Sequence, residues 1–389
     1  MEYLPNNFQD ILLENLKDFD LAKLSSESKS YSDISFPDIY LKDLNNIMNI
    51  TSLTEESWKD IKNNSKYMDV FINLTIIDSS GTNVKSFKEI PNNVFPNLVK
   101  FNLESNKLAS FEGISDNVFS KLEELNLKSN QITSFKEISD NAFPKLIELN
   151  LESNKITSFK GISDNTFPKL KKLNLNSNRI SSLFKIKENA FPNLEELNLE
   201  NNKIKSFIFI DSNAFPKLKV LDLNFNEITS FEGITKKTFP NLEELNLNYN
   251  RIESLRIFNN RGIFPKLKKL NLNFNRISSF KIMKNTFPKL EELNLESNKI
   301  ESFKFIDSDA FPNLKKLNLK YNEIKSFELF NEIFSNLIYL NLIGGKKLAF
   351  KGVSLLNFPK LEELHILDNQ IGDIYKPVGD LKFKLLYGH

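Results

Sequence analysis

Between residues 95 and 333 the sequence repeats a single pattern ten times, and this repetition constrains the fold more than any other feature. One copy, residues 143–166, reads FPKLIELNLESNKITSFKGISDNT. Its neighbours follow at intervals of 24 residues, with one interval of 25 and one of 23. The copies begin at Phe95, Phe119, Phe143, Phe167, Phe191, Phe215, Phe239, Phe264, Phe287 and Phe311. One copy cannot bury its large apolar side chains alone, so the copies are expected to stack on one another.

Each copy contains a segment with the alternation of a strand. Leu149 and Leu151 alternate with polar neighbours, which predicts a short strand with one buried face. Asn154 follows at a turn, where its amide can donate to and accept from backbone groups that burial would leave unpaired. We expect the equivalent asparagines to form a buried ladder: Asn106, Asn130, Asn154, Asn178, Asn202, Asn226, Asn250, Asn275, Asn298 and Asn322.

The spacing Leu-x-x-Leu-x-Leu-x-x-Asn inside this frame resembles the leucine-rich repeat. The resemblance implies an α/β solenoid, a horseshoe whose strands form a parallel sheet on the concave side. We assign residues 71–381 to the solenoid, with about 13 repeats of 23–25 residues. The first and last copies depart from the pattern, as terminal repeats that cap a stack often do. Residues 382–389 are assigned to a C-terminal tail.

Composition excludes several kinds of site. The chain has no cysteine, so it has neither disulfides nor cysteine zinc sites, and this favours a reducing compartment. Its start has the features of neither a signal peptide nor a membrane span, so we expect an intracellular, cytoplasmic protein. The two histidines, His365 and His389, cannot supply a Ser–His–Asp triad within the regular stack. We therefore expect no enzyme activity, no metal and no cofactor.

The exposed positions of the predicted sheet form columns that run across the strands. One column is nearly all asparagine, which is typical of a row of amides bonded to one another. In another, acidic repeats such as Glu195-Glu196 alternate with basic repeats such as Lys171-Lys172, which places opposite charges on neighbouring strands. A nucleic-acid groove needs a continuous basic stripe, so the alternation argues against nucleic acid as a partner, and a net charge of +2 gives no case for a membrane.

A third column, directly before the ladder asparagine, changes from serine to large aromatic side chains in the second half of the chain. Exposed aromatic clusters mark interaction sites. We therefore predict that this column and its neighbours bind a target protein, through Val220, Phe225, Asn248, Tyr249, Asn273, Phe274 and Tyr321. The alternative is that the rings fold over the adjoining loops as internal packing.

Residues 1–34 lie outside the repeat and show apolar residues at helical spacing, which predicts short amphipathic helices. The segment resembles an F-box, the adaptor-binding module of a family of ubiquitin-ligase substrate receptors. The matching residues are Leu4, Pro5, Phe8, Leu12, Leu13, Leu16, Leu21, Leu24 and Tyr31. The resemblance implies that they bind a Skp-type adaptor of a cullin–RING ligase. The alternative is a helical cap that seals the first repeat. Residues 35–70 are assigned to a linker or helical N-terminal cap.

Two functions follow from these features. In the first, the chain is the substrate receptor of a cullin–RING (SCF-type) ubiquitin ligase and selects a target protein on the concave face of the repeats. In the second, it is an intracellular leucine-rich repeat scaffold or effector without a link to ubiquitin ligases. Both functions are protein recognition without chemistry by the chain itself.

Overall fold

The computed structural model describes a large part of the repeat region. The described residues are 74–90, 95–164, 166–183, 186–188, 190–207, 213–255, 262–278, 286–304, 310–328, 333–344, 349–351, 355–367 and 384–388. The helices predicted in residues 1–34 and the linker or cap in 35–70 therefore lie outside the described residues.

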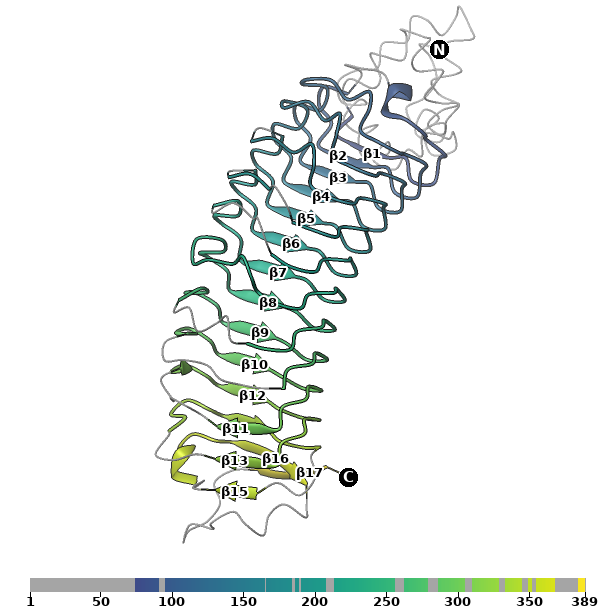
Figure 1. Cartoon of the computed structure of the whole chain (residues 1–389). Coiled ribbons are helices and arrows are strands. Elements are labelled where there is room, and N and C mark those ends of the chain that lie inside the picture. The colour runs from purple at the N-terminus through teal and green to yellow at the C-terminus, as the bar shows by residue number, and fades with distance from the viewer. Residues whose placement is uncertain are drawn as a thin grey trace, which may run out of the picture. The chain divides into compact units, whose positions relative to one another are not determined.

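The described residues form two compact units. The first contains four parallel strands that pair in chain order (Figure 1). They are β1 (Ile76–Asp78), β2 (Lys100–Asn102), β3 (Glu124–Asn126) and β4 (Glu148–Asn150).

The second unit contains a longer parallel sheet of the same kind, which continues along the chain with one strand from each repeat (Figure 1). Its strands are β5 (Lys172–Asn174), β6 (Glu196–Asn198), β7 (Val220–Asp222), β8 (Glu244–Asn246), β9 (Lys269–Asn271), β10 (Glu292–Asn294), β12 (Lys316–Asn318), β14 (Tyr339–Asn341), β16 (Glu363–Leu367) and β17 (Lys384–Gly388). A separate three-stranded parallel sheet pairs β11 (Ser302–Lys304), β13 (Ser326–Glu328) and β15 (Ala349–Lys351).

The repeat length sets the register of the long sheet in the second unit. Leu221 in β7 is paired with Leu197 on one side and Leu245 on the other, so equivalent positions of successive repeats become direct neighbours. In the three-residue strands of this unit's long sheet the central leucine is buried, whereas most of the residues on either side of it are half-buried or exposed. Any column of the sequence pattern is therefore also a row on the surface of the sheet.

The predicted asparagine ladder is confirmed, and all ten of its members are buried. The side-chain amide of Asn226 donates to the carbonyl oxygen of Leu199 in the preceding repeat at 2.9 Å and to that of Leu223 in its own repeat at 3.1 Å. Its Oδ1 atom accepts from the backbone N–H of Ile204 at 3.0 Å. One side chain thus satisfies backbone groups of two repeats that burial would otherwise leave unpaired.

In several repeats the opening phenylalanine packs on its counterpart in the next. Within the first unit the rings of Phe119 and Phe143 lie parallel with centroids 5.9 Å apart, and within the second those of Phe191 and Phe215 lie 5.5 Å apart. Such aromatic pairs stabilise by about 0.5–1.5 kcal/mol beyond their burial. The core of each unit therefore contains stacked rings beside buried leucines.

Two expectations differ from the structure. The described residues contain no α-helix, so the α component of the expected α/β solenoid is missing there; two short 3₁₀ helices occur, at Phe87–Glu89 and Leu355–Asn357. A 24-residue repeat leaves few residues for the segment that leads from the end of one strand to the start of the next. Proline, serine and asparagine in this segment favour turns. Residues 382–389 were expected to be a tail, but they contain strand β17, which pairs with β16.

We predict that Asn226→Ala lowers the free energy of unfolding by about 3 kcal/mol, because it removes several hydrogen bonds and leaves buried backbone groups of two repeats unpaired. Urea denaturation measures this loss. Hydrogen exchange should also accelerate at the amide of Ile204, which donates to the Asn226 side chain. The exposed Lys203→Ala is the control and should change stability by less than about 0.5 kcal/mol. Equal stability of the two variants would contradict the role of the ladder.

Candidate functional site

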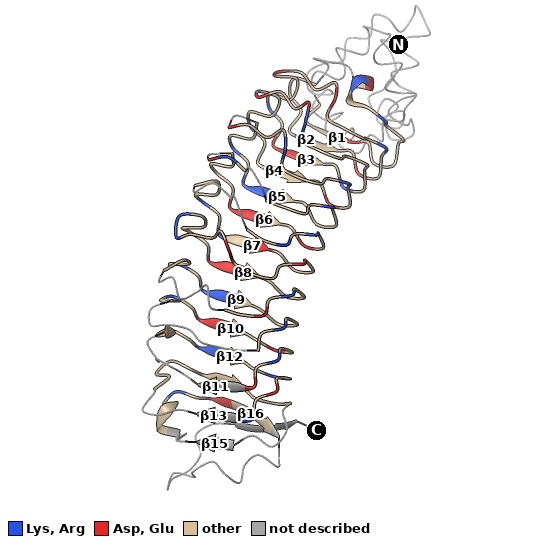
Figure 2. Cartoon of the chain, in the orientation of Figure 1, with Lys and Arg blue, Asp and Glu red and all other residues tan. Residues whose placement is uncertain are grey.

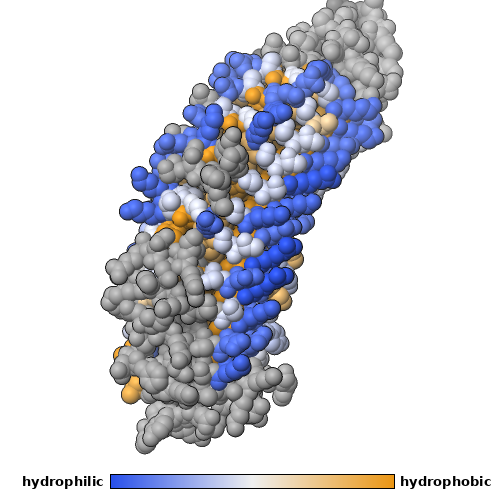
Figure 3. Space-filling view, viewed as in Figure 1, coloured by the Kyte–Doolittle hydropathy of each residue, from blue (hydrophilic) through white to orange (hydrophobic). Residues whose placement is uncertain are grey.

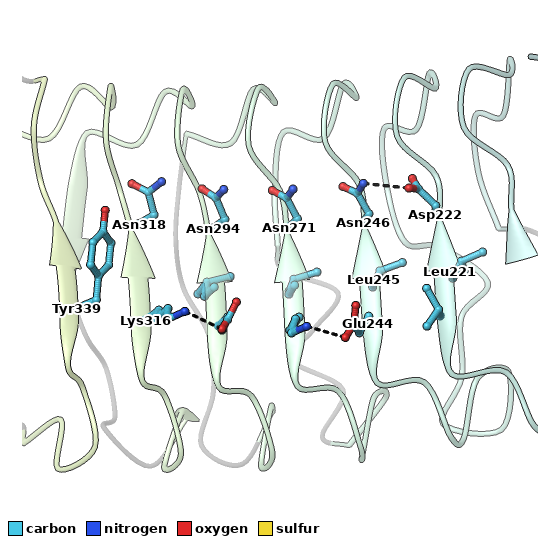
Figure 4. A pocket seen from close by; sticks show the side chains of 15 residues that line it. Leu221, Asp222, Glu244, Leu245, Asn246, Asn271, Asn294, Lys316, Asn318 and Tyr339 are labelled. Atoms are coloured by element: carbon cyan, nitrogen blue, oxygen red, sulfur yellow. Dashed lines mark hydrogen bonds and ion pairs between the residues drawn. The ribbon is translucent and has the colours of Figure 1, made fainter. Parts of the chain in front are cut away.

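The exposed face of the second unit's sheet carries a hollow of about 440 Å³ over strands β7 to β14 (Figure 4). Val220 lines it in β7 and Tyr339 lines it in β14. Between them, charged side chains from the first position of each strand and polar side chains from the third position face the hollow. The leucines between these positions belong to the core, so the available chemistry is that of the two exposed columns.

The third strand position presents a row of amides that includes one carboxylate, that of Asp222. The Asn246 side chain donates to Asp222 Oδ2 at 3.2 Å, as Figure 4 shows. In the first unit the row bonds along itself, with Asn126 donating to Asn102 Oδ1 at 3.0 Å. Many of these amides also accept from a backbone N–H two residues later, as Asn271 does from Asn273 at 3.2 Å. The row of amides is therefore largely engaged in holding the strand ends.

In the second unit most charges on neighbouring strands from β5 to β12 alternate in sign, as predicted, and many form ion pairs (Figure 2). Lys219 lies 2.6 Å from Glu195, and Lys269 lies 2.7 Å from Glu244. The hydrogen bond from Lys219 lowers the pKa of Glu195, and Lys268 lowers that of Glu243 in the same way. These pairs are exposed to solvent, so they fix the order of neighbouring side chains more than they add stability.

The column before the ladder asparagine holds a stack of exposed aromatic rings. Phe225, Tyr249 and Phe274 are 47 %, 40 % and 41 % exposed. Tyr249 lies parallel to both neighbours, with centroids 4.3 Å from each and planes inclined by 7°. We call these three residues the aromatic stack. The rings pack on one another, and a large part of each remains open to solvent.

The aromatic stack is held in an unfavourable backbone conformation. Phe225, Tyr249 and Phe274 have φ angles of 50°, 49° and 51°. This left-handed region costs about 1–2 kcal/mol for a residue with a Cβ atom, and it is least suited to bulky side chains. Serine occupies the same position at Ser177 and Ser297, also with positive φ. The fold therefore requires the conformation in every repeat, but it does not require a ring.

Three amide oxygens beside the aromatic stack lack hydrogen-bond donors. They are the Oδ1 atoms of Asn224, Asn248 and Asn273, each of which directly precedes a ring of the stack and is shielded from solvent. A buried acceptor without a donor costs about 1–3 kcal/mol. In the described part of the chain, Ser139 Oγ is the one other buried side-chain atom of this kind. The unpaired acceptors are therefore concentrated at the aromatic stack.

The structure brings together most of the residues predicted to bind a target, but not all. Val220 is 36 % exposed at the hollow, and Asn248 and Asn273 adjoin the stack. Tyr321 is 54 % exposed but stands apart, because Ser297 separates it from the stack in the same column. The Lys320 ammonium lies 4.5 Å from the centroid of the Tyr321 ring. The predicted contiguous patch is therefore a stack of three rings and a separate tyrosine.

Gly344 follows Tyr321 in this column, where the pattern of the sheet would otherwise place a side chain. Its φ angle is 101°, and a Cβ atom at this position would lie 2.9 Å from the backbone N and Cα atoms of Tyr321. Glycine is required at this point, because any larger residue would collide with the preceding repeat.

Sequence reasoning did not include Asp222 or Tyr339 in the site. Asp222 and Tyr339 line the hollow, and both depart from the residue that most repeats have at their position. These departures were the signal that could have identified them. The nine residues predicted to bind an adaptor, Leu4 to Tyr31, lie outside the described residues.

Other kinds of site have no support in the part of the chain that the structure describes. No three His, Asp or Glu side chains there are grouped closely enough to hold a metal ion. His365 contacts Glu363 at 3.1 Å and lies against the Tyr339 ring. Within the same residues no helix has the length and apolar character needed to cross a bilayer.

Comparison with known families identifies the repeats. Residues 120–164, 168–212, 216–260 and 265–308 match the family described as Leucine Rich repeats (2 copies). No curated protein sequence matches the chain. The family match and the observed parallel sheet together confirm the leucine-rich repeat prediction for this part of the chain.

Solved structures show the same fold. A leucine-rich repeat protein of Leptospira interrogans is 26 % identical, with a TM-score of 0.57, and the match covers 79 % of this chain and 75 % of that one. The leucine-rich repeat domain of APL1 is 20 % identical, with a TM-score of 0.59 and coverage of 90 % and 87 %. A third match is to an octameric complex of Latrophilin 3, Unc5D and FLRT2, in which FLRT2 contributes the repeats; it has 25 % identity, a TM-score of 0.52 and coverage of 64 % and 76 %.

The charge alternation makes a prediction about titration. Lys219→Gln should raise the pKa of Glu195 toward the ordinary glutamate range, because the Lys219 hydrogen bond is the main cause of its depression. Lys217→Gln is the matched control and should raise it less, because Lys217 acts only through space. NMR titration of the Glu195 side chain measures both changes.

The same depression has a consequence for stability. A carboxylate with a lowered folded pKa stabilises the fold above its unfolded pKa and loses this contribution as the pH falls through the folded value. The stability difference between wild type and Lys219→Gln should therefore shrink in acid, below the ordinary glutamate range. A difference that grows with acid would contradict the assignment.

Proposed function

We propose that the chain is a protein-recognition module that binds a target protein on the exposed face of the second unit's sheet, with the aromatic stack as its centre. The observation that carries the proposal is the exposure of Phe225, Tyr249 and Phe274 in a conformation that is costly for a ring. Serine fills the same position elsewhere in the chain, so the fold does not account for the rings.

Energetics support the aromatic stack as the centre of an interface. Tyrosine and phenylalanine bury large areas with little loss of side-chain freedom, and hot spots cluster where such anchors are fully covered. Mutual packing of the three rings fixes their positions before binding, which lowers the entropy cost of association. Much of the face that Figure 3 draws is hydrophilic, and polar side chains beside the aromatic stack, such as Asn248 and Asn273, would form a polar rim.

A leucine-rich repeat protein of similar fold is found in a complex with other proteins. FLRT2, whose repeats contribute to the octameric complex with Latrophilin 3 and Unc5D, is 25 % identical to this chain over the matched region. This supports a protein as the kind of partner.

A more specific form of the proposal makes the chain the substrate receptor of a cullin–RING ubiquitin ligase. The support is the F-box resemblance between Leu4 and Tyr31, ahead of leucine-rich repeats. In this form the N-terminal segment binds a Skp-type adaptor and the repeats hold the target, so that ubiquitin transfer proceeds by proximity. It also implies an intracellular, cytoplasmic location. The alternative is a scaffold or effector that binds one partner and recruits no ligase.

Replacing Tyr249 and Phe274 with serine tests the proposed surface. Tyr249→Ser/Phe274→Ser should abolish capture of the target from lysate, because it removes two of the three anchors. The variant gives these repeats the residue found at Ser177 and Ser297, so the melting temperature should change by only a few degrees. The exposed Thr229→Ala is the control and should retain binding. Retained binding by the double serine variant, or its unfolding, would refute the proposal.

A second experiment separates the ligase form from the alternative. A purified Skp-type adaptor should bind the wild-type chain and should bind Leu4→Ala/Pro5→Ala at least about tenfold more weakly, since two of the matched apolar contacts are lost. Calorimetry measures both affinities, and Tyr249→Ser/Phe274→Ser serves as the control that should keep adaptor binding. If the wild-type chain does not bind the adaptor, the ligase form is wrong and the scaffold alternative stands.

A further inference from the structure

The alternation of charge across the second unit's sheet is interrupted at β7, and again at β14, where Tyr339 stands at the first strand position. From β5 to β12 the residues at the first strand position run from lysine to glutamate and back again, except at β7 (Figure 2). The series reads Lys172, Glu196, Val220, Glu244, Lys269, Glu292 and Lys316. Val220 is paired in register with Glu196 and with Glu244, so a neutral side chain stands where the alternation calls for a cation.

This interruption removes one positive charge from the first-position column at β7. Glu196 is 3.7 Å from Lys172, a looser contact than the 2.7 Å that joins Glu244 to Lys269. In the same strand as Val220, the Asp222 carboxylate accepts from the Asn224 N–H and the Asn246 amide, which are both neutral donors. Three carboxylates, those of Glu196, Asp222 and Glu244, therefore lie around Val220 with no lysine at its own position, while the ammonium of the adjacent Lys219 is hydrogen-bonded to Glu195.

The same repeat also begins the aromatic stack. Val220 is 36 % exposed, and Phe225, five residues further on, is the first ring of the stack. In this one repeat Val220 stands where most repeats have a charged residue, Asp222 stands where they have asparagine, and Phe225 stands where serine is common. A partner side chain that packed along Val220 would contact the apolar valine with its stem and would bring its end close to a carboxylate of Glu196 or Glu244.

We propose that the partner segment that packs on the aromatic stack carries a lysine or arginine, which rests its aliphatic part on Val220 and supplies the cation that the sheet lacks between Glu196 and Glu244. This inference rests on the proposed function and adds the chemistry of the partner. Lysine and arginine combine an apolar stem with a charged end, and both bind favourably over aromatic faces.

The unpaired acceptors beside the stack favour the same kind of partner. The Oδ1 atoms of Asn224, Asn248 and Asn273 lack donors, and ammonium and guanidinium groups carry donors only. A small reorientation of the rings on binding would expose these oxygens to the partner's N–H groups. An acidic partner would instead place acceptors against acceptors and carboxylates against carboxylates.

Selection of displayed peptides tests the inference with a defined probe. A library of random peptides on phage is selected against the full-length chain, and the best peptide is then synthesised. We expect selected peptides to contain a lysine or arginine beside an apolar residue. Val220→Lys/Asp222→Asn completes the charge alternation with residues found at the same positions of neighbouring repeats, so the variant should fold as the wild type does. It should bind the peptide about tenfold more weakly.

Two controls make the result specific. A peptide whose basic residue is replaced by glutamine should also bind about tenfold more weakly, and this change should cause no further loss on the double variant, because both remove the same interaction. Phe225→Ser/Tyr249→Ser/Phe274→Ser should bind none of the selected peptides. Thermal unfolding checks that each variant is folded.

The outcomes separate the two proposals. Peptides that need the aromatic stack but carry no basic residue, or that bind Val220→Lys/Asp222→Asn as tightly as wild type, overturn this inference and leave the proposed function standing. Peptides that the triple serine variant retains, or a failure to select any peptide on the wild-type chain, overturn the proposed function and this inference together.

Discussion

The bonds of the ladder asparagines hold the stack of repeats together. A 24-residue repeat without an α-helix in its described part must turn sharply after each strand, and the turn buries backbone groups that have no partner of their own. The side chain of Asn226 reaches carbonyl oxygens in its own and the preceding repeat and accepts from the amide of Ile204. Because the bonds to Leu199 and from Ile204 join consecutive repeats, stability spreads from neighbour to neighbour along the chain.

The asparagine ladder and the leucine core stabilise the fold, so residues in the exposed columns can vary and can serve binding. Serine at Ser177 and Ser297 shows what the position before the ladder requires, and Phe225, Tyr249 and Phe274 exceed it. In a repeat protein the residue that most copies have at a position thus shows what the fold requires there. Departures that cluster in one repeat, as they do around β7, therefore point to binding more strongly than they would in a protein without repeats.

The sequence predicts the strands, the ladder and the alternating ion pairs because each follows from residues at fixed spacing, such as Leu149, Leu151 and Asn154. It does not predict the parallel packing of Tyr249 on its neighbours, which depends on a backbone angle that the sequence does not state. The gap at Ser297 could be read in the sequence, but its consequence for Tyr321 follows from how far apart the strands lie. The unpaired oxygen of Asn224 depends on which groups surround it in space, so it appears only in the structure.

The register of the sheet has a consequence for how such a chain changes over generations. Leu197, Leu221 and Leu245 are lateral neighbours because each is one period from the next. Duplication or loss of one whole repeat would leave the flanking repeats paired in the same register, whereas an insertion of a few residues would not. The gene can therefore lengthen, shorten or move the interface by unequal recombination while every junction keeps its geometry.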